Sequence, residues 1–222
     1  MIEALVFDMD GLLIDSESLA TQAMDTFLGR YGLERRFEVH RQLLGRRLPD
    51  AIAIVRDAYN MQIPLQNLID EYGELRVAAL RGSVKPMPGA LEIIAFGRLA
   101  GLKLALATSG MRSHATISMS ETGLTGLFDA EVTGDEVAHG KPAPDLFLAA
   151  AERIGVDPER CIVFEDAPNG VTAGKAAGMT VIAVPNESSH VLEFPVAPDV
   201  VLPDLFAAPE WLFQLGVAAL SS

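Results

Sequence analysis

The sequence is poor in cysteine and in basic residues. Its 222 residues include one cysteine, Cys161, so no disulfide forms within the chain, and we expect a reducing compartment. Cys161 lies in an apolar run, where we expect a buried small hydrophobic residue. Only 17 Lys and Arg oppose 30 Asp and Glu, which gives a net charge of −13. Because nucleic-acid binding relies on clustered basic side chains, we expect no nucleic-acid partner.

Long hydrophobic runs are also missing. No apolar stretch approaches the ~20 residues that span a bilayer, and the first residues lack the basic start and apolar segment of a signal peptide. We therefore expect a cytoplasmic protein with no membrane partner. Hydrophobic residues make up 50% of the chain, which allows a sizeable core. A small anionic substrate remains compatible with the acidic chain, because it needs only local cations and a metal.

Short apolar strands alternate with amphipathic helices in the second half of the chain. We predict strands over 104–107, 130–133, 162–164 and 181–184, and helices over 89–99, 145–154 and 170–177. This alternation predicts an α/β fold with a doubly wound, mostly parallel sheet. The segment 16–83 contains no convincing strand, and its apolar residues recur at helical spacing. We therefore predict a helical domain at 16–83, inserted into a core of 1–15 and 84–222.

The most informative motif is Asp8-Met9-Asp10-Gly11, which directly follows the apolar run 4–7. Two carboxylates this close raise each other's pKa unless a cation neutralises them. Mg²⁺ prefers oxygen ligands, and the carboxyl ends of strands in open α/β sheets are where ligands bind. The motif thus predicts a metal site with an aspartate that can act as a nucleophile.

Three further polar clusters follow predicted strands or lie close to them. Thr108-Ser109-Gly110 can hold a phosphate oxygen or cap the next helix. Lys141, in a Gly-Lys-Pro turn, can neutralise phosphoryl charge or be a solvated surface lysine. Glu165-Asp166 offers a metal ligand or a helix cap. Because the ends of parallel strands share one edge, the four clusters together predict one site.

These four clusters resemble the four motifs of the haloacid dehalogenase superfamily, in the expected order and across the whole chain. The segment 16–83 then corresponds to the helical cap between the first two motifs. The resemblance is closest to the β-phosphoglucomutase-like phosphatase branch, which includes pseudouridine 5′-phosphate and 2-deoxyglucose 6-phosphate phosphatases. It implies a Mg²⁺-dependent phosphatase that acts on a small phosphorylated metabolite and is a monomer.

The resemblance implies roles for individual residues. Asp8 is expected to attack phosphorus and form an aspartyl-phosphate, and Asp10 to act first as general acid and then as general base. Thr108 and Lys141 are expected to bind the phosphate oxygens.

It also implies a metal site. Mg²⁺ is expected to bind the Asp8 carboxylate, the Asp10 backbone carbonyl and Asp166. Glu165 is expected to bind the same ion directly or through water.

Three positions favour a phosphatase over a phosphosugar mutase. The mutases carry a histidine where this chain has Ala20, and a lysine and an arginine where it has Leu44 and Leu48. Asp15-Ser16-Glu17 is similar to the phosphatases of the branch, and Asp10 argues against dehalogenation, because haloacid dehalogenases lack a carboxylate there. A mutase and a non-catalytic phosphometabolite-binding protein remain the alternatives.

Substrate contacts are expected from Glu17, Arg46, Arg47, Ser109 and Gly110. Glu17 can bind a substrate hydroxyl or merely extend a helix start. Arg46 and Arg47 can meet a phosphate or hydroxyl, or be solvated charges on the cap surface.

Four other polar residues have no matching motif or only weak support. Arg112 is expected at the mouth of the pocket, and His114, His139 and His190 in surface or loop roles.

Overall fold

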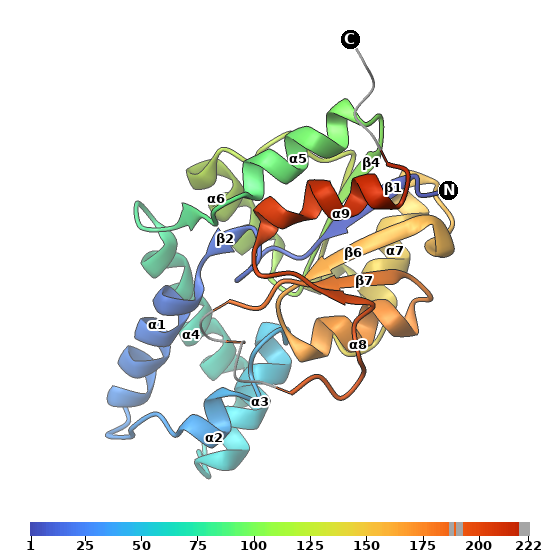
Figure 1. Cartoon of the computed structure of the whole chain (residues 1–222). Helices are drawn as coiled ribbons and strands as arrows, with labels where there is room; N and C mark the ends of the chain where they lie inside the picture. Colours follow the sequence, from blue (N-terminus) through green and yellow to red (C-terminus); the bar gives the residue numbers. More distant parts are fainter. Residues whose placement is uncertain (187–188, 190–192, 218–222) are drawn as a thin grey trace.

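The computed structural model describes residues 1–186, 189 and 193–217, which form an α/β core and a helical insert (Figure 1). The main sheet contains β1 (Ala4–Phe7), β4 (Lys103–Thr108), β5 (Ala130–Thr133), β6 (Cys161–Glu165), β7 (Thr180–Ala183) and β8 (Val200–Val201). Within the described residues the strand order is β5-β4-β1-β6-β7-β8, and every neighbouring pair is parallel. The prediction of a doubly wound parallel sheet is confirmed.

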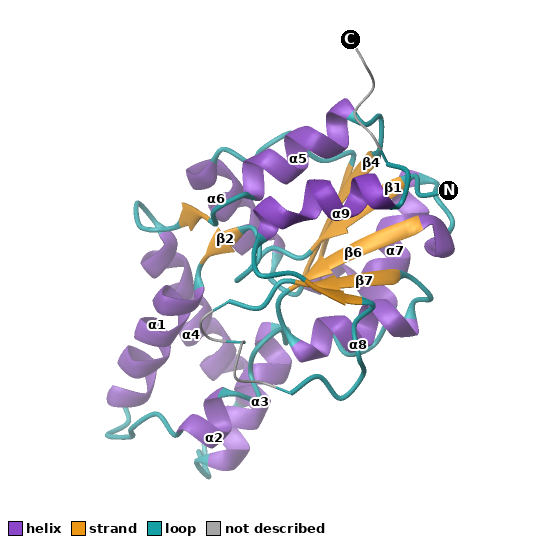
Figure 2. Ribbon diagram, in the orientation of Figure 1, coloured by secondary structure: helices purple, strands orange, loops and turns teal. Residues whose placement is uncertain are grey.

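Helices cover both faces of this sheet (Figure 2). One face packs against α5 (Ala90–Leu99), α6 (Arg112–Thr122) and α9 (Ala208–Gln214), and the other against α7 (Asp145–Ile154) and α8 (Pro168–Ala176). Along β1, Leu5 and Phe7 belong to the first hydrophobic layer, and Ala4 and Val6 to the second. Burial on both faces explains why the strands are continuous apolar runs in the sequence.

The insert consists of α1 (Glu17–Gly29), α2 (Phe37–His40), α3 (Leu48–Ala58) and α4 (Leu65–Leu80). It has a hydrophobic cluster of its own, in which the rings of Phe27 and Tyr72 lie 5.4 Å apart. The two connections to the core form a small antiparallel sheet of β2 (Ile14–Asp15) and β3 (Lys85–Pro86). These two-residue strands are too short to produce a sequence pattern, and they tie the entry and exit of the insert together.

The strand order reverses beside β1. Successive strands move from β1 through β4 to β5, and the chain then crosses to β6 on the other side of β1. In open α/β sheets such a reversal leaves a crevice at the carboxyl ends of the strands, where ligands bind. The segments that follow β1 and β6 carry Asp8 and Asp166 to this crevice.

Short 3₁₀ helices complete the core at Gly134–Glu136, Pro158–Arg160 and Leu205–Ala207. Among the described residues, no helix has the length and apolar character to cross a bilayer.

Candidate active site

Lys141 lies at the centre of the carboxyl edge of the sheet. Its side chain is fully buried, and its ammonium group donates to Asp8 Oδ1, to Glu165 Oε1 at 2.8 Å and to the carbonyl of Ala107 at 3.2 Å. The Nζ atom also lies 4.7 Å from the centre of the Phe147 ring. Burial alone would lower the pKa of Lys141, but the Asp8 and Glu165 carboxylates raise it overall, so the residue is a fixed cation. The alternative of a solvated surface lysine is wrong.

Glu165 binds the ammonium group of Lys141 and fixes its position. Its Oε1 accepts from the lysine, and its Oε2 accepts from the backbone N–H of Ala167 at 2.8 Å. Gly170 makes room for this carboxylate, because a Cβ there would lie 1.6 Å from Oε1. One oxygen of Glu165 thus fixes Lys141 and the other binds the backbone of Ala167, and a contact of Glu165 with a metal, direct or through water, stays a prediction.

Asp166 lies beside the turn that follows β1. Its Oδ2 accepts from Asn186 Nδ2 at 2.8 Å, and the same amide donates to the Gly11 carbonyl at 2.9 Å. Gly11 has a φ of +82°, and a Cβ there would lie 2.6 Å from Asp166 Oδ2, so only glycine suits this close approach. Asp166 does not cap α8, whose N-cap residue is Ala167.

The acidic groups of this edge outnumber the buried cations. Burial raises the pKa of Asp8 to about 8, with Lys141 opposing the rise and Glu165 adding to it. Burial and the Glu165 and Asp8 carboxylates raise the pKa of Asp166 well above its usual range. Such a set fits a hard divalent cation, which takes carboxylate and carbonyl oxygens and keeps several waters. Among the described residues, no three Asp, Glu, His or Cys side chains form a ready-made metal cage.

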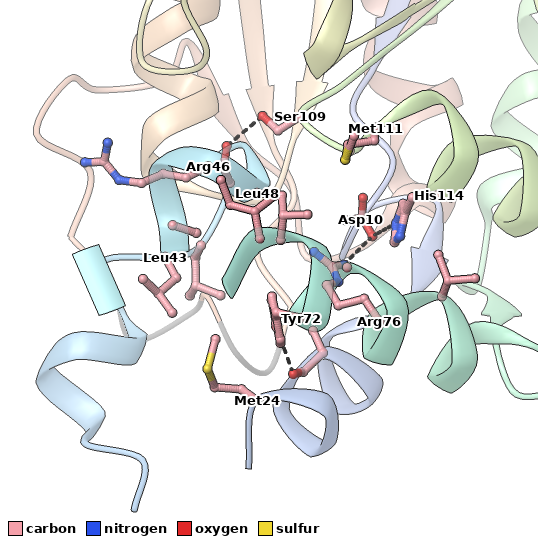
Figure 3. Close-up of a pocket in the computed structure, with 18 of the residues that line it drawn as sticks. Asp10, Met24, Leu43, Arg46, Leu48, Tyr72, Arg76, Ser109, Met111 and His114 are labelled. Atoms are coloured by element: carbon pink, nitrogen blue, oxygen red, sulfur yellow. Dashed lines mark hydrogen bonds and ion pairs between the residues drawn. The ribbon is translucent and has the colours of Figure 1, made fainter. Parts of the chain in front are cut away.

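Asp10 has different surroundings. Its Oδ1 accepts from Ser16 Oγ at 2.6 Å, contacts His114 Nε2 at 2.8 Å and lies 3.5 Å from Arg76 Nη2, as Figure 3 shows for the last two. Its Oδ2 lies 3.4 Å from Thr108 Oγ1. Burial raises the pKa of Asp10, but His114, Arg76 and Ser16 outweigh it and hold that pKa below its usual range. Asp10 is thus a carboxylate held by donors from the core, the insert and the connection between them.

Two partners of Asp10, His114 and Arg76, were not predicted from the sequence. His114 is buried on α6 and contacts the site, so the expectation of a surface or loop role is wrong. A sequence signal does mark Arg76, because it lies four residues after Tyr72 and four before Leu80, and both of these are buried on α4. A charged residue on the buried stripe of a helix needs a partner, and here that partner is Asp10.

Thr108 and its neighbours form the floor of the site. Thr108 is fully buried at the end of β4, and its Oγ1 accepts from the N–H of Gly110 at 2.9 Å. Ser109 Oγ donates to the Gly45 carbonyl of the insert at 2.8 Å. None of these residues caps α6, whose N-cap residue is Met111, so the capping alternative is wrong.

A pocket of about 390 Å³ lies between the insert and the carboxyl edge (Figure 3). Asp8, Asp10, Ser109 and Gly110 line it from the core side. The residues that line it from the insert and its connection include Glu17, Ala20, Met24, His40, Leu43, Leu44, Arg46, Leu48, Ile69, Tyr72, Arg76 and Val77. The predicted catalytic aspartates therefore face the helical insert across a cavity large enough for a small ligand.

The structure places the three insert residues that are predicted to contact substrate, Glu17, Arg46 and Arg47, in different surroundings. Glu17 lines the pocket half-buried, and burial together with the Asp10 charge raises its pKa to about 7. Arg46 lines the pocket, but its Nε donates to the Gln42 carbonyl at 2.8 Å and its guanidinium points away from the other labelled residues in Figure 3.

Arg47 points to the core instead of the pocket. Its guanidinium pairs with Asp50 at 2.8 Å and donates to the carbonyls of Val137 at 3.1 Å and Ala138 at 3.2 Å. The expectation that Arg47 binds substrate is corrected, because its donors are engaged in holding the insert against the core loop before Lys141.

The remaining polar candidates lie outside the pocket. Arg112 pairs with Glu131 at 2.8 Å and Glu136 at 2.7 Å, so the expectation that it defines the pocket mouth is wrong. His139 is exposed and contacts Asp145 at 3.0 Å, in a loop role as expected. His190 lies outside the described residues. Cys161 is buried and free, as expected.

Comparisons with known proteins agree with this architecture. The family model described as haloacid dehalogenase-like hydrolase matches residues 2–178. A phosphorylated carbohydrates phosphatase of Thermotoga maritima is 35% identical over 178 residues, which cover 80% of this chain and 82% of that protein. A probable pseudouridine-5′-phosphatase of Drosophila melanogaster is 37% identical over 190 residues, with coverages of 82% and 80%.

Solved structures show the same arrangement. The structure of CbbY from Rhodobacter sphaeroides with xylulose-1,5-bisphosphate has a TM-score of 0.82 at 29% identity, and the match covers 92% of this chain and 95% of that one. The fold, the site and these relatives define a phosphatase, a hydrolase of phosphoric monoesters. Within that class, the chain belongs to the haloacid dehalogenase-like hydrolase family.

Proposed function

We propose that the protein is a Mg²⁺-dependent phosphatase that hydrolyses a sugar phosphate or nucleoside monophosphate through an aspartyl-phosphate on Asp8. The observation that carries this proposal is the buried Lys141, which is shared between Glu165 and Asp8, the latter being a residue that lines the pocket. A lysine fixed there holds the nucleophile in position and offsets the charge of an arriving phosphate.

The first half-reaction uses the different surroundings of the two aspartates. An Asp8 carboxylate oxygen forms a bond to phosphorus while the ester P–O bond breaks, and the departing alkoxide takes the proton of the Asp10 carboxyl group. Ser16, His114 and Arg76 then stabilise the Asp10 carboxylate that proton transfer leaves behind. Because its low pKa leaves Asp10 ionised before substrate binds, the proton that it passes to the alkoxide comes from an ester that arrives as the phosphate monoanion.

The second half-reaction reverses the role of Asp10. Its carboxylate removes a proton from water, the water oxygen forms a bond to phosphorus, and the bond between Asp8 and phosphorus breaks to release inorganic phosphate. Thr108 contributes a buried hydroxyl beside Asp10 for the phosphate oxygens.

The metal would be held by the Asp8 carboxylate, the Asp10 backbone carbonyl and Asp166. When bound, Mg²⁺ neutralises charge between the anionic phosphate and the aspartates. The crowding of buried acidic groups at this edge supports the proposal.

Residues 16–83 serve in this proposal as a cap that covers the substrate and excludes water, on a core of 1–15 and 84–222. The separate hydrophobic cluster of the insert and the paired strands at its two connections support this division. The protein acts as a monomer in the cytoplasm under the same proposal.

Measurement of released phosphate over a panel of phosphorylated metabolites tests the proposal. We expect release with Mg²⁺ and none with EDTA; no release from any member with Mg²⁺ would favour a phosphometabolite-binding protein instead. A hexose 1-phosphate in the panel distinguishes a phosphatase from a mutase, because a phosphatase releases inorganic phosphate and a mutase forms the 6-phosphate isomer. The apolar Ala20, Leu44 and Leu48 in the pocket wall favour free phosphate as the product.

A further inference from the structure

The pocket has two chemically different ends. Its core end carries Asp8, Asp10, Ser109 and Gly110, where the phosphate group reacts. Much of the remaining wall is apolar and is built by Met24, Leu44, Leu48, Ile69, Tyr72 and Met111. The alcohol part of a bound phosphate ester therefore faces side chains that offer it almost no hydrogen bonds.

The polar residues of the lining do not change this picture. Gln66, Asp70 and Glu74 are exposed at the rim, and Gln66 donates to Asp70 at 2.8 Å. Arg76 is engaged with Asp10, and the Arg46 guanidinium points away (Figure 3). Ser113 is exposed like the rim residues, and His114 is engaged with Asp10. Glu17 is the polar side chain of the lining that remains, and it lies within the influence of the Asp10 charge at the core end, so few donors and acceptors face a polyhydroxylated sugar deep in the pocket.

His40 also lines this wall. Its Nδ1 atom is buried and has no hydrogen-bond partner, and it is shielded from the cavity as well. His40 therefore offers a bound alcohol no hydrogen bond through this nitrogen, and the wall suits a largely apolar group better than a chain of hydroxyl groups.

We propose that the preferred substrate is a phosphomonoester whose alcohol carries a flat, largely apolar ring, in preference to a hexose phosphate. This inference rests on the proposed phosphatase function and names the chemical class of its leaving group. Burial of the ring against the leucines and Tyr72 stabilises its complex, whereas each sugar hydroxyl buried there without a partner weakens binding. Leu44 and Leu48 are the residues that determine this preference.

The test compares benzyl phosphate with glucose 6-phosphate, because both are esters of primary alcohols. With Mg²⁺, we expect kcat/KM for benzyl phosphate to exceed that for glucose 6-phosphate at least about tenfold. Equal values, or a preference for glucose 6-phosphate, would overturn the inference. Acetyl phosphate serves as a third substrate that places no ring or sugar in the apolar part of the pocket.

A substitution at Leu44 tests whether the apolar pocket wall causes the preference for benzyl phosphate. Leu44 lines the pocket but is not part of the hydrophobic cluster of the insert, so Leu44→Gln changes the wall without opening that cluster. We expect Leu44→Gln to lower the benzyl-to-glucose ratio about tenfold and Leu44→Met to retain it. Phe37→Gln, at an exposed position of α2, is the matched control and leaves the ratio unchanged. An unchanged ratio in Leu44→Gln would contradict the role of the wall.

The same measurements distinguish a wrong substrate class from a wrong phosphatase proposal. Hydrolysis of acetyl phosphate without a preference for benzyl phosphate contradicts the substrate class alone. If neither these three compounds nor any member of the metabolite panel releases phosphate, the phosphatase proposal fails and the substrate class fails with it.

Discussion

Asp8 and Asp10 are separated by one residue, yet their carboxyl groups have opposite electrostatic surroundings. Burial and neighbouring carboxylates raise the pKa of Asp8 to about 8 against the pull of Lys141, whereas His114 and Arg76 outweigh burial and lower the pKa of Asp10. Two titratable groups whose surroundings shift their pKa values apart are suited to different tasks. The two roles therefore have different requirements: Asp8 needs a cation beside it to ionise as a nucleophile, and Asp10, already ionised, must gain a proton before it can act as an acid.

His114 is a positioning residue in this account, because it contacts Asp10 and not the reacting atoms. We expect His114→Ala to lower kcat about 10- to 100-fold with a much smaller change in KM, since a misplaced Asp10 impairs proton transfer more than binding. His114→Gln, which can also donate from a terminal nitrogen, should restore much of the loss. Steady-state kinetics measure both parameters.

If His114 has only a structural role, the expected result is different. His114→Ala would then lower the melting temperature without lowering kcat more than it changes KM, and His114→Gln would restore nothing. Thr116→Ala, at an exposed position of the same helix, is the control and should behave like the original protein.

The residues at strand ends could be predicted from sequence, but their partners across the site could not. Asp8, Thr108 and Asp166 each follow or end an apolar strand, and parallel topology brings such positions together. Arg76 and His114 are placed by the packing of α4 and α6, which depends on contacts over more than sixty positions from Asp10. No local pattern encodes such contacts.

Elements of the core could be predicted closely because their burial leaves strong patterns. The predicted strand 130–133 and helix 145–154 match β5 and α7 residue for residue, and the other predicted elements differ by one or two residues at one or both ends. The two-residue strands β2, β3 and β8 and the short helix α9 have no pattern long enough to detect.

Glu136 joins three elements behind the site. Its carboxylate accepts from the N–H of Thr133 at 2.8 Å and pairs with Arg112 at 2.7 Å and Arg153 at 3.2 Å, so it links β5, α6 and α7. Burial raises its pKa, but these donors outweigh burial and lower the pKa to about 2. The same segment leads into the loop that carries Lys141.

The lowered pKa of Glu136 predicts how the stability of the fold changes in acid. Because the folded pKa is below the unfolded value, the carboxylate stabilises the fold above about pH 4.5, and this contribution is lost as the pH falls towards 2. Partial exposure of the pairs limits it to about 1–2 kcal/mol. We expect Glu136→Gln to be less stable than the original protein at pH 6 and nearly equal to it at pH 2.

Urea denaturation at the two pH values gives the free energies of unfolding. A stability difference that stays constant between pH 6 and pH 2 would contradict the assigned pKa shift. Glu159→Gln, in the short 3₁₀ helix before β6, is a control away from this cluster.

At the scale of the whole molecule, the insert and the core meet through a few polar contacts around the pocket. Arg76 reaches Asp10, Arg47 reaches the carbonyls of Val137 and Ala138, and Ser109 reaches the Gly45 carbonyl. The insert keeps a hydrophobic cluster of its own, while Leu80 of α4 and Leu19 of α1 pack against the core cluster. The polar contacts can therefore form and break while the insert's own cluster stays intact. This is the arrangement expected of a cap that closes over a substrate.

Arg47 provides a test of that arrangement. We expect Arg47→Ala to raise KM about three- to tenfold with little change in stability, because loss of the contact to the core loop lowers the fraction of closed protein. Arg56→Ala, whose side chain pairs only with the adjacent Asp57 among the described residues, is the matched control. An unchanged KM in Arg47→Ala would show that the contact does not hold the cap closed.

The central claim is that the phosphoryl group passes through Asp8. Acid quenching during turnover, followed by mass spectrometry of the peptide that contains Asp8, tests this most directly. The account predicts a phosphoryl group on Asp8 in the original protein, and neither this group nor phosphate release in Asp8→Asn. Sustained phosphate release by folded Asp8→Asn, or turnover with no phosphoryl group on that peptide, would contradict it.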